Sequence, residues 1–268
     1  MTQEKYVGFF YLKIFSIFVI LLIVVSIIYR VYSEVASSKF INNSFSILYV
    51  AKDSKLIYVD KNSKEALFLA IGDMRKIVKG KNYLGVAFSL GLPINALIMD
   101  ESPPANLSEF SSSNSEWRLL FSGKVSLKNM NRYDIHKIVS AIRDTPKDNR
   151  VEKRVNIFDR EVLKDLDERF VDSSIVNMPY TIEIENGTVI DGLGSQLAHI
   201  LGKEGFNVIA VRTSRPASSS FIAFPQKNNS YTGSLIGLTG FEYREEKVSQ
   251  AADVTIFLGD DLEAMLVP

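Results

Sequence analysis

The hydrophobic pattern of the chain begins with one long apolar run near the N-terminus. Residues 14–29 read IFSIFVILLIVVSIIY and contain no charge. With their apolar neighbours they make about 25 residues of helix-compatible sequence, and a helix needs about 20 to cross a bilayer. Lys13 lies where its side chain can reach the interface, and Tyr29 and Tyr32 lie where an aromatic belt is expected. The pattern predicts a cytoplasmic tip and a single transmembrane helix within residues 1–33.

Two other interpretations of this run are a cleaved signal peptide and a buried core helix. A signal peptide has an apolar stretch of about 7–15 residues and small residues at its cleavage site. This run is longer, and Val35-Ala36-Ser37 is a poor cleavage signal. A core helix needs a polar face, for which the run offers only Ser16 and Ser26. Basic residues flank both ends, and their slight excess on the N-terminal side favours a cytoplasmic N-terminus with the bulk of the chain outside the cell membrane.

Beyond the helix the pattern changes to short apolar runs. Residues 34–43 are polar and predict a stalk, and three runs follow at 45–51, 56–59 and 66–71, separated by turn residues. That arrangement is typical of a β-meander. We predict a mixed α/β region over residues 44–179. Its further elements are a helix at 83–90, a strand at 94–99, a loop at 101–115, a helix at 135–142, a strand at 155–158 and a helix at 160–170.

The C-terminal part, residues 180–268, alternates short strands and helices. Residues 180–185 (YTIEIE) alternate like a strand, 191–202 form an amphipathic helix, and 206–211 form a second strand. The order predicts a small βαββαβ domain with helices on one face of a sheet, so that the fold class is α+β. The remaining elements are strands at 221–224, 241–244 and 253–258 and a helix at 231–238.

Composition excludes several chemistries. The chain has no Cys and two His, which removes disulfides, zinc ribbons, iron–sulfur sites and thiol catalysis. We therefore expect no metal site and no bound cofactor. Net charge is zero, and we expect no nucleic-acid partner. Residues 180–268 carry six basic and eleven acidic side chains, which makes this part acidic and leaves the remainder basic.

A basic stretch runs from Lys124 to Arg160, with ten basic and five acidic residues. The simpler interpretation is a solvated surface of mixed charge, which we favour. The alternative is contact with anionic lipid headgroups. Within the C-terminal domain, residues 191–197 (DGLGSQL) have the context of a dinucleotide-binding turn, but Leu197 stands where a small residue is needed. We therefore do not predict a nucleotide site.

The C-terminal part resembles a known family. A strand followed by Asn-Gly-Thr, Gly-Leu-Gly, a helix and Gly-Phe-x-Val resembles the opening of the C-terminal domain of LytR/CpsA/Psr proteins. The later Ala-Asp-Val-x-Ile-x-Leu-Gly-x-Asp resembles the end of the same domain. The resemblance implies attachment outside the membrane of a bacterial cell envelope, and it brings no catalytic residues. Its motif residues are Asn186, Gly187, Thr188, Gly192, Gly194, Gly205, Asp253 and Gly259.

The middle region resembles the catalytic domain of that family only faintly. Gly72-Asp73-Met74-Arg75 lies where the family has Pro-Arg-Asp, and Gly-Leu-Pro-Ile-Asn at 91–95 is similar to its Gly-Ile-Pro-Ile-Asp. The long Arg-bearing stretch between these landmarks is missing. Asp73 and Arg75 alone cannot clamp a pyrophosphate, which needs several Arg, with Asp residues holding Mg²⁺. We interpret the region as a shortened, degenerate relative and assign it no catalytic residues.

Two hypotheses follow. The first is a single-pass envelope protein whose extracytoplasmic part is a non-catalytic binding or scaffolding module for cell-wall polymer or a partner protein. The alternative is a phosphotransferase of the LytR/CpsA/Psr type, which attaches glycopolymers from polyprenyl-pyrophosphate carriers to peptidoglycan. Only under this alternative would Asp73 and Arg75 act as catalytic residues with Mg²⁺.

Overall fold

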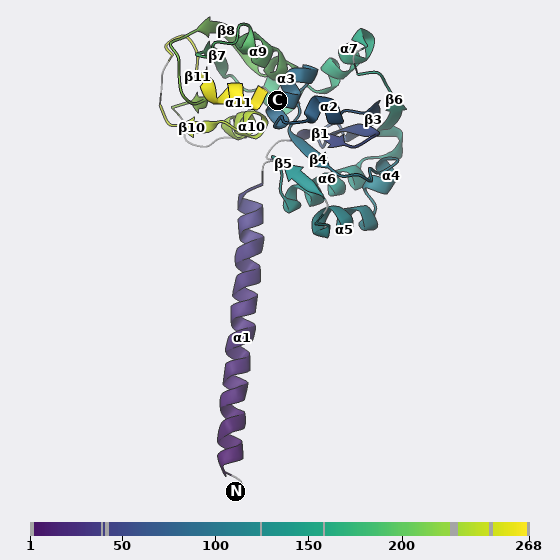
Figure 1. The fold of residues 1–268 in the computed structure, drawn as a ribbon, viewed down its shortest axis with the longest axis vertical. Helices are drawn as coiled ribbons and strands as arrows, with labels where there is room; N and C mark the ends of the chain where they lie inside the picture. Colours follow the sequence, from purple (N-terminus) through teal and green to yellow (C-terminus); the bar gives the residue numbers. More distant parts are fainter. Residues whose placement is uncertain are drawn as a thin grey trace. The chain divides into compact units, whose positions relative to one another are not determined.

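The computed structural model describes residues 3–38, 40, 43–123, 125–157, 159–225, 230–246 and 249–266. The chain divides into two compact units, Met1–Ser38 and Lys39–Pro268. The first contains the helix α1 (Gln3–Ala36), drawn as one long helix in Figure 1. Its segment Lys13–Ala36 is apolar and long enough to cross a membrane, and none of it is buried. A core helix would be mostly buried, so this observation favours the transmembrane interpretation.

The second unit begins with a six-stranded sheet in the order β5-β4-β1-β2-β3-β6. The predicted meander is present: the first three strands pair antiparallel in sequence order. The strand β4 then returns parallel to β1, and β6 lies parallel to β3 at the far edge. The strands are β1 (Ser44–Val50), β2 (Ser54–Asp60), β3 (Glu65–Gly72), β4 (Ala96–Met99), β5 (Ser126–Lys128) and β6 (Arg150–Arg154).

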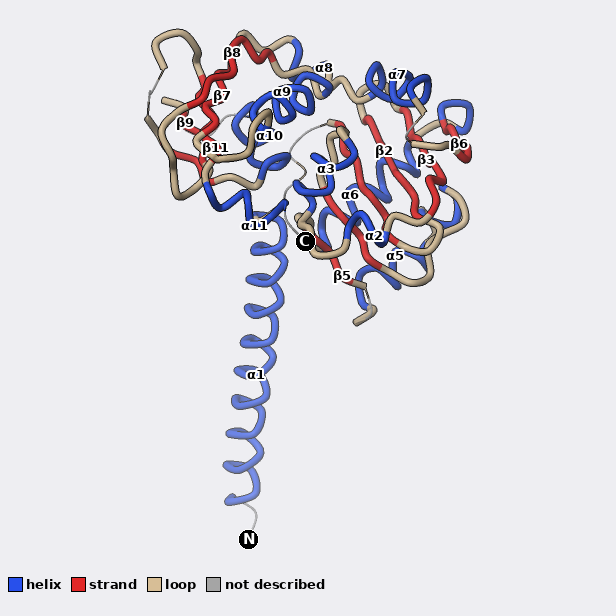
Figure 2. The backbone as a smooth tube through the Cα atoms, turned by 45° about the horizontal axis from the view of Figure 1, so that its top comes forward, coloured by secondary structure: helices blue, strands red, loops and turns tan. Residues whose placement is uncertain are grey.

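Helices cover both faces of this sheet (Figure 2). Because side chains alternate along a strand, Ile47 and Tyr49 pack in one core cluster while Leu48 and Val50 pack in the other. The first cluster includes α4 (Leu107–Phe110), α5 (Ser113–Phe121) and α6 (Arg132–Asp144), and a 3-10 turn at Lys147–Asn149 follows. The second cluster includes α2 (Arg75–Val78), α3 (Tyr83–Leu90), α7 (Arg160–Arg169) and α8 (Ser173–Val176).

The C-terminal part forms a separate five-stranded sheet in the order β10-β9-β11-β7-β8. Three of its pairs are parallel, and two of these, β7–β8 and β9–β10, are each joined through a helix. Right-handed crossovers put both helices on the same face, as predicted. Neither helix covers the other face, which we call the open face. The elements are β7 (Thr181–Asn186), α9 (Leu193–Lys203), β8 (Asn207–Thr213), β9 (Phe221–Ala223), α10 (Ser230–Thr239), β10 (Glu242–Arg244), β11 (Val254–Leu258), a 3-10 turn (Asp260–Leu262) and α11 (Glu263–Leu266).

One hydrophobic core joins the two sheets. Helix α3 contacts both α9 and α11, and a buried polar seam runs beside it. The Asn95 amide nitrogen donates to Glu204 Oε1 at 3.3 Å, and Lys203 Nζ donates to the carbonyl of Gly91 at 2.8 Å. Asn129 Nδ2 lies 2.7 Å from the carbonyl oxygen of Gly237, and donates to it. The domain boundaries proposed at 33/34, 43/44 and 179/180 stay predictions within this arrangement.

Two sequence predictions in the middle region were wrong. The loop at 101–115 contains α4 and the start of α5, because Asn106 and Ser112 cap these short helices by accepting hydrogen bonds from Glu109 N and Ser115 N. The strand placed at 155–158 lies earlier, at Arg150–Arg154. This strand is a charged edge strand, so it lacks the apolar alternation on which the prediction relied. Residue 158 lies outside the described residues.

The seam predicts a pH-dependent stability. Burial raises the pKa of Glu204 from its ordinary 4.5 to about 8, so the folded chain keeps this carboxyl protonated at neutral pH. Its stabilising contribution is complete below pH 4.5 and is lost as pH rises toward 8, at about 1.4 kcal/mol per pH unit at most. We expect E204Q to unfold with a higher free energy than wild type at pH 8 and with a similar one at pH 5.

Denaturant unfolding of the detergent-solubilised chain at several pH values, followed by circular dichroism, measures this difference. The exposed E101Q is the matched control and should keep the wild-type pH profile. A profile of E204Q parallel to wild type would contradict the assignment of Glu204.

Candidate functional site

The Asn-Gly-Thr motif forms a tight turn at the carboxyl end of β7. Asn186 Oδ1 accepts hydrogen bonds from Thr188 N at 3.1 Å and Thr188 Oγ1 at 2.7 Å. Gly187 N donates to the carbonyl of Leu258 at 2.9 Å, because β7 and β11 are parallel and end side by side. A Cβ on Gly187 would lie 2.7 Å from the carbonyl oxygen of Arg215. The turn therefore requires glycine for the loop 214–220 to pack against it.

The other motif residues also support the backbone. Asp253 Oδ2 accepts from Thr181 N and Thr181 Oγ1, each at 2.8 Å, and joins the starts of β11 and β7. A Cβ on Gly194 would lie 2.8 Å from Val211 Cγ1, so this glycine lets α9 approach β8 closely. Gly192 and Gly205 both have positive φ, at 77° and 96°. None of these contacts assembles a catalytic group among the described residues.

Substitution of glycine by alanine should change the free energy of unfolding in opposite directions at Gly259 and Gly202. A Cβ on Gly259 would lie 2.7 Å from Ser219 N, so G259A should lower the free energy of unfolding by about 1–3 kcal/mol through overpacking. Gly202 lies in α9 with open space around it, so G202A should raise that free energy by about 0.5–1 kcal/mol. Denaturant unfolding measures both, and equal effects of the two variants would refute the packing argument.

The two residues of the transferase alternative pair with each other. Arg75 Nη2 lies 2.6 Å from Asp73 Oδ2, and its Nε donates to Asp73 Oδ1 at 2.9 Å. The hydrogen bonds from Arg75 lower the pKa of Asp73 to about 2. Both side chains are exposed on the turn between β3 and α2. Each is thus satisfied by its sequence neighbour and is not held toward a shared ligand.

Arg75 nevertheless lines a cleft of about 880 Å³ beyond the carboxyl ends of the parallel strands β1 and β4. Ligands of open α/β sheets bind in this kind of position. Asp100, at its wall, contacts Arg118 at 3.2 Å and accepts a hydrogen bond from Tyr49 Oη. Within the described residues no group of three acidic or His side chains could hold a metal ion. The charged side chains that line the cleft are Lys52, Arg75, Lys79, Lys81, Asp100, Glu101 and Lys128.

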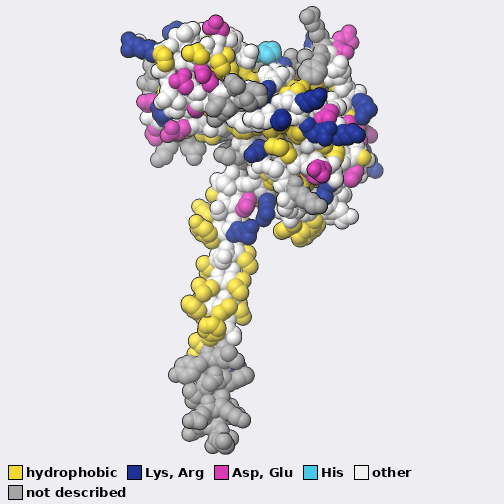
Figure 3. Space-filling view, in the orientation of Figure 1, with side chains coloured by type: hydrophobic (Ala, Val, Ile, Leu, Met, Phe, Trp, Pro, Cys, Tyr) yellow, Lys and Arg dark blue, Asp and Glu magenta, His cyan; other side chains and the backbone are white. Residues whose placement is uncertain are grey.

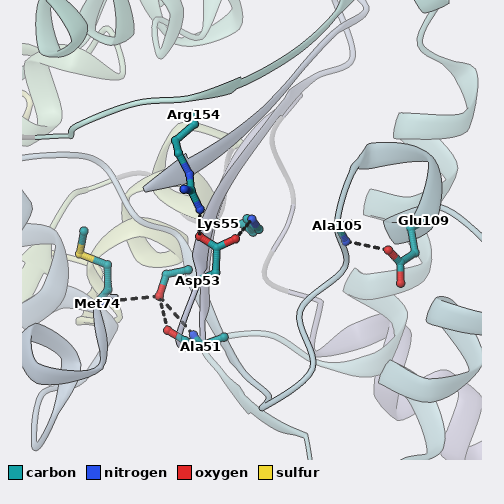
Figure 4. A network of polar contacts seen from close by, with 8 residues as sticks. Ala51, Asp53, Lys55, Met74, Ala105, Glu109 and Arg154 are labelled. Atoms are coloured by element: carbon teal, nitrogen blue, oxygen red, sulfur yellow. Dashed lines mark hydrogen bonds and ion pairs between the residues drawn. The ribbon is translucent and has the colours of Figure 1, made fainter. Parts of the chain in front are cut away.

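The turn between β1 and β2 contributes Ala51 and Lys52 to the lining of this cleft. Figure 4 shows the polar contacts of this turn. Ser54 Oγ donates to the carbonyl of Ala51 at 2.8 Å and accepts from Met74 N at 3.2 Å. Asp53 on the same turn binds Lys55 and, at 3.1 Å, Arg154. The hydrogen bond from Lys55 is the largest influence that lowers the pKa of Asp53. The cleft therefore has a fixed wall, but a single Arg among its basic residues is a poor match for a pyrophosphate clamp.

The open face of the C-terminal sheet carries a second arrangement. Strand register puts five residues in one row across the sheet, with Phe221 beside Phe257 at its centre. The two rings are stacked, with centroids 4.5 Å apart and planes at 17°. The Arg244 guanidinium carbon lies 3.8 Å from the Phe221 ring centroid. In order, the row is Glu242, Phe221, Phe257, Glu185 and Arg212.

Charged groups surround this aromatic pair. Arg212 Nε lies 2.8 Å from Glu183 Oε1, and Glu183 is buried although it belongs to the open face. Burial and the nearby Glu183 raise the pKa of Glu185. The face therefore combines two half-buried rings with guanidinium donors and carboxylate acceptors. We call this set, Glu183, Glu185, Arg212, Phe221, Glu242, Arg244 and Phe257, the aromatic face.

Sequence reasoning missed the aromatic face. The signal was available in the strands at 221–224 and 253–258. Both strands carry apolar side chains on the face away from the helices as well as on the core face. A strand with one solvated face is expected to alternate with polar residues, so Phe221 and Phe257 are exceptions to that pattern. The exception becomes meaningful only when the register shows the two rings side by side.

Comparison with known proteins identifies the C-terminal region. Residues 179–262 match the family described as LytR cell envelope-related transcriptional attenuator, at the position where the resemblance was predicted. No curated protein gives a significant match. The solved structure of the Lin1025 protein from Listeria innocua aligns over 71% of this chain and 88% of its own, at 12% identity and a TM-score of 0.20. A TM-score this low carries no argument.

The chain thus contains a LytR C-terminal domain, and the predicted resemblance is confirmed. Together with the apolar helix Lys13–Ala36, this domain identifies a membrane-anchored protein of the cell envelope.

Proposed function

We propose that this protein is a non-catalytic binding module, held on the outer side of the cytoplasmic membrane by α1, whose C-terminal domain binds cell-wall polymer. The single observation that carries this proposal is the aromatic face. It presents stacked rings among charged side chains on a sheet face that neither α9 nor α10 covers.

The chemistry of the face fits a glycan. A sugar ring has an apolar C–H face, which packs on an aromatic ring, and hydroxyl groups at its edge. Arg212 and Arg244 offer donors to these hydroxyls, and Glu185 offers acceptors. The domain carries eleven acidic and six basic side chains, so it repels a polyanion. The proposal therefore commits to a glycan of low charge density, such as the sugar strands of peptidoglycan.

Removal of one ring should weaken polymer binding. We expect F257A to reduce binding of the full-length, detergent-solubilised chain to purified peptidoglycan about five- to ten-fold, because one stacking surface of about 1 kcal/mol or more is lost. Co-sedimentation at increasing polymer concentration measures this, and R244A should weaken binding without removing a ring.

The matched control is V189A, which removes an exposed apolar side chain from the same domain outside the aromatic face. Circular dichroism of each variant verifies folding. Equal binding by F257A and V189A, or no retention of the wild type, would reject the glycan proposal. Retention of an envelope protein without polymer would instead favour the partner-protein form of the hypothesis.

The transferase alternative gains no support from the pairing of Asp73 with Arg75. It predicts Mg²⁺-dependent release of phosphate from a polyprenyl-pyrophosphate substrate, abolished by R75A. We expect no release above background and no change in R75A, measured by a phosphate assay on the full-length chain. Activity that depends on both Mg²⁺ and Arg75 would reverse this conclusion.

A further inference from the structure

Helix α5 exposes two stacked aromatic side chains. Trp117 and Phe121 are 63% and 61% exposed, and their ring centroids are 4.7 Å apart. In the described part of the second unit they are the exposed aromatic residues, and Figure 3 shows hydrophobic side chains gathered over α5. Apolar surface that stays in water as a contiguous patch marks an interaction site more often than scattered single residues do.

The packing of α5 explains why this pair faces outward. Residues 117 and 121 lie one helical turn apart, whereas Glu116 and Leu119 are buried on the opposite side. Leu119 belongs to the core cluster beneath the helix. The inner face of α5 is therefore already filled, and nothing in the described fold covers the outer one.

Basic groups lie beside the aromatic pair. The Arg132 guanidinium carbon is 6.0 Å from the Phe121 ring centroid. Lys61 and Lys137 line a neighbouring cleft of about 720 Å³ along α6, which also contains the acidic Asp144. The buried Glu116 is neutralised by Arg143 Nη2 at 2.7 Å and also contacts His136. One basic side chain, Arg132, thus lies beside the rings, while Lys61 and Lys137 line the neighbouring cleft.

The chain leaving α1 is fastened to the same end of α6. Phe40 is buried, its backbone N–H donates to Asp134 Oδ1 at 3.4 Å, and its carbonyl accepts from Lys137 Nζ. Asp134 lies in the first turn of α6, as does Arg132. Only residues 37–39 separate Ala36 from Phe40, a step of at most about 14 Å. The second unit is therefore joined to the membrane-spanning helix by a short connection that ends at a residue fastened to α6.

We propose that the outer surface of α5, formed by Trp117, Phe121 and Arg132, docks into the headgroup region of the bilayer in which the chain is anchored. Trp is enriched at membrane interfaces, where its apolar ring enters the acyl boundary and its N–H stays hydrated. Each Lys or Arg near an anionic surface adds about 1 kcal/mol of attraction. A bilayer fits better than a protein partner because the chain is anchored in lipid at all times by a helix that ends four residues before Phe40.

The proposal rests on membrane anchoring, which is part of the proposed function, but not on polymer binding. Failure of either can therefore be observed without the other: peptidoglycan co-sedimentation reports the aromatic face, and lipid quenching reports α5.

Trp117 is the single Trp of the chain, so its fluorescence reports this surface alone. The test reconstitutes the full-length chain into vesicles of phosphatidylcholine and phosphatidylglycerol, with and without brominated acyl chains. We expect the brominated lipid to quench most of the emission and the bilayer to protect it from aqueous acrylamide. The variants F121S and R132E should each show less quenching and a red-shifted emission.

The matched control moves the reporter within the same anchored chain. W117F/V189W puts the single Trp at an exposed position of the C-terminal domain, and its emission should resist brominated lipid and yield to acrylamide. Quenching of both reporters to the same extent would overturn the proposal, since mere proximity would then explain it. Emission from Trp117 that brominated lipid leaves unchanged would also overturn it; protection from acrylamide in that case would identify a protein contact.

Discussion

Asn95 connects the two sheets through hydrogen bonds on both sides of its amide group. Its oxygen accepts from Ser46 N on β1 at 2.7 Å, and its nitrogen donates to Glu204 at the end of α9 at 3.3 Å. Ser46, Asn95 and Glu204 are all buried, so a shift between the sheets would leave polar groups without partners. A buried group that loses its partner costs about 1–3 kcal/mol. Apolar residues of both sheets share one core cluster. The buried hydrogen bonds fix how the two sheets are placed against each other.

Because the two sheets are fixed against each other, residues 39–268 form one compact unit. Asn129 adds a second constraint, because its Nδ2 donates to both the Asn95 and the Gly237 carbonyls at 2.7 Å. Its backbone has a φ of 56°, a conformation that Asn tolerates better than most residues. Helix α5 packs on the first sheet, whereas the aromatic face is part of the second sheet. Docking of α5 on lipid, as proposed, would therefore also fix the direction of the aromatic face relative to the membrane.

The sequence was informative where local pattern determines structure. The hydrophobic periodicity correctly predicted the meander, the helices α3 and α6, and the order of elements in the C-terminal part. The edge strand β6 was missed because residues 150–154 are almost all charged. The hydrogen bond from Asn95 could not be predicted from local sequence either, because its partner Glu204 is 109 positions away. The aromatic face depends on the pairing of β9 with β11, which periodicity along a single strand cannot reveal.

The family motif and the proposed binding residues occupy different parts of the same domain. Gly187 and Gly259 are required because backbone of the loop 214–220 packs within 3 Å of where their Cβ atoms would be. Phe221 and Phe257 meet no such demand, since their rings project from the open face. The packing of these loops therefore does not depend on which side chains the open face carries. The family match accordingly describes the scaffold of residues 179–262, whereas the proposed choice of ligand rests on the residues of the aromatic face.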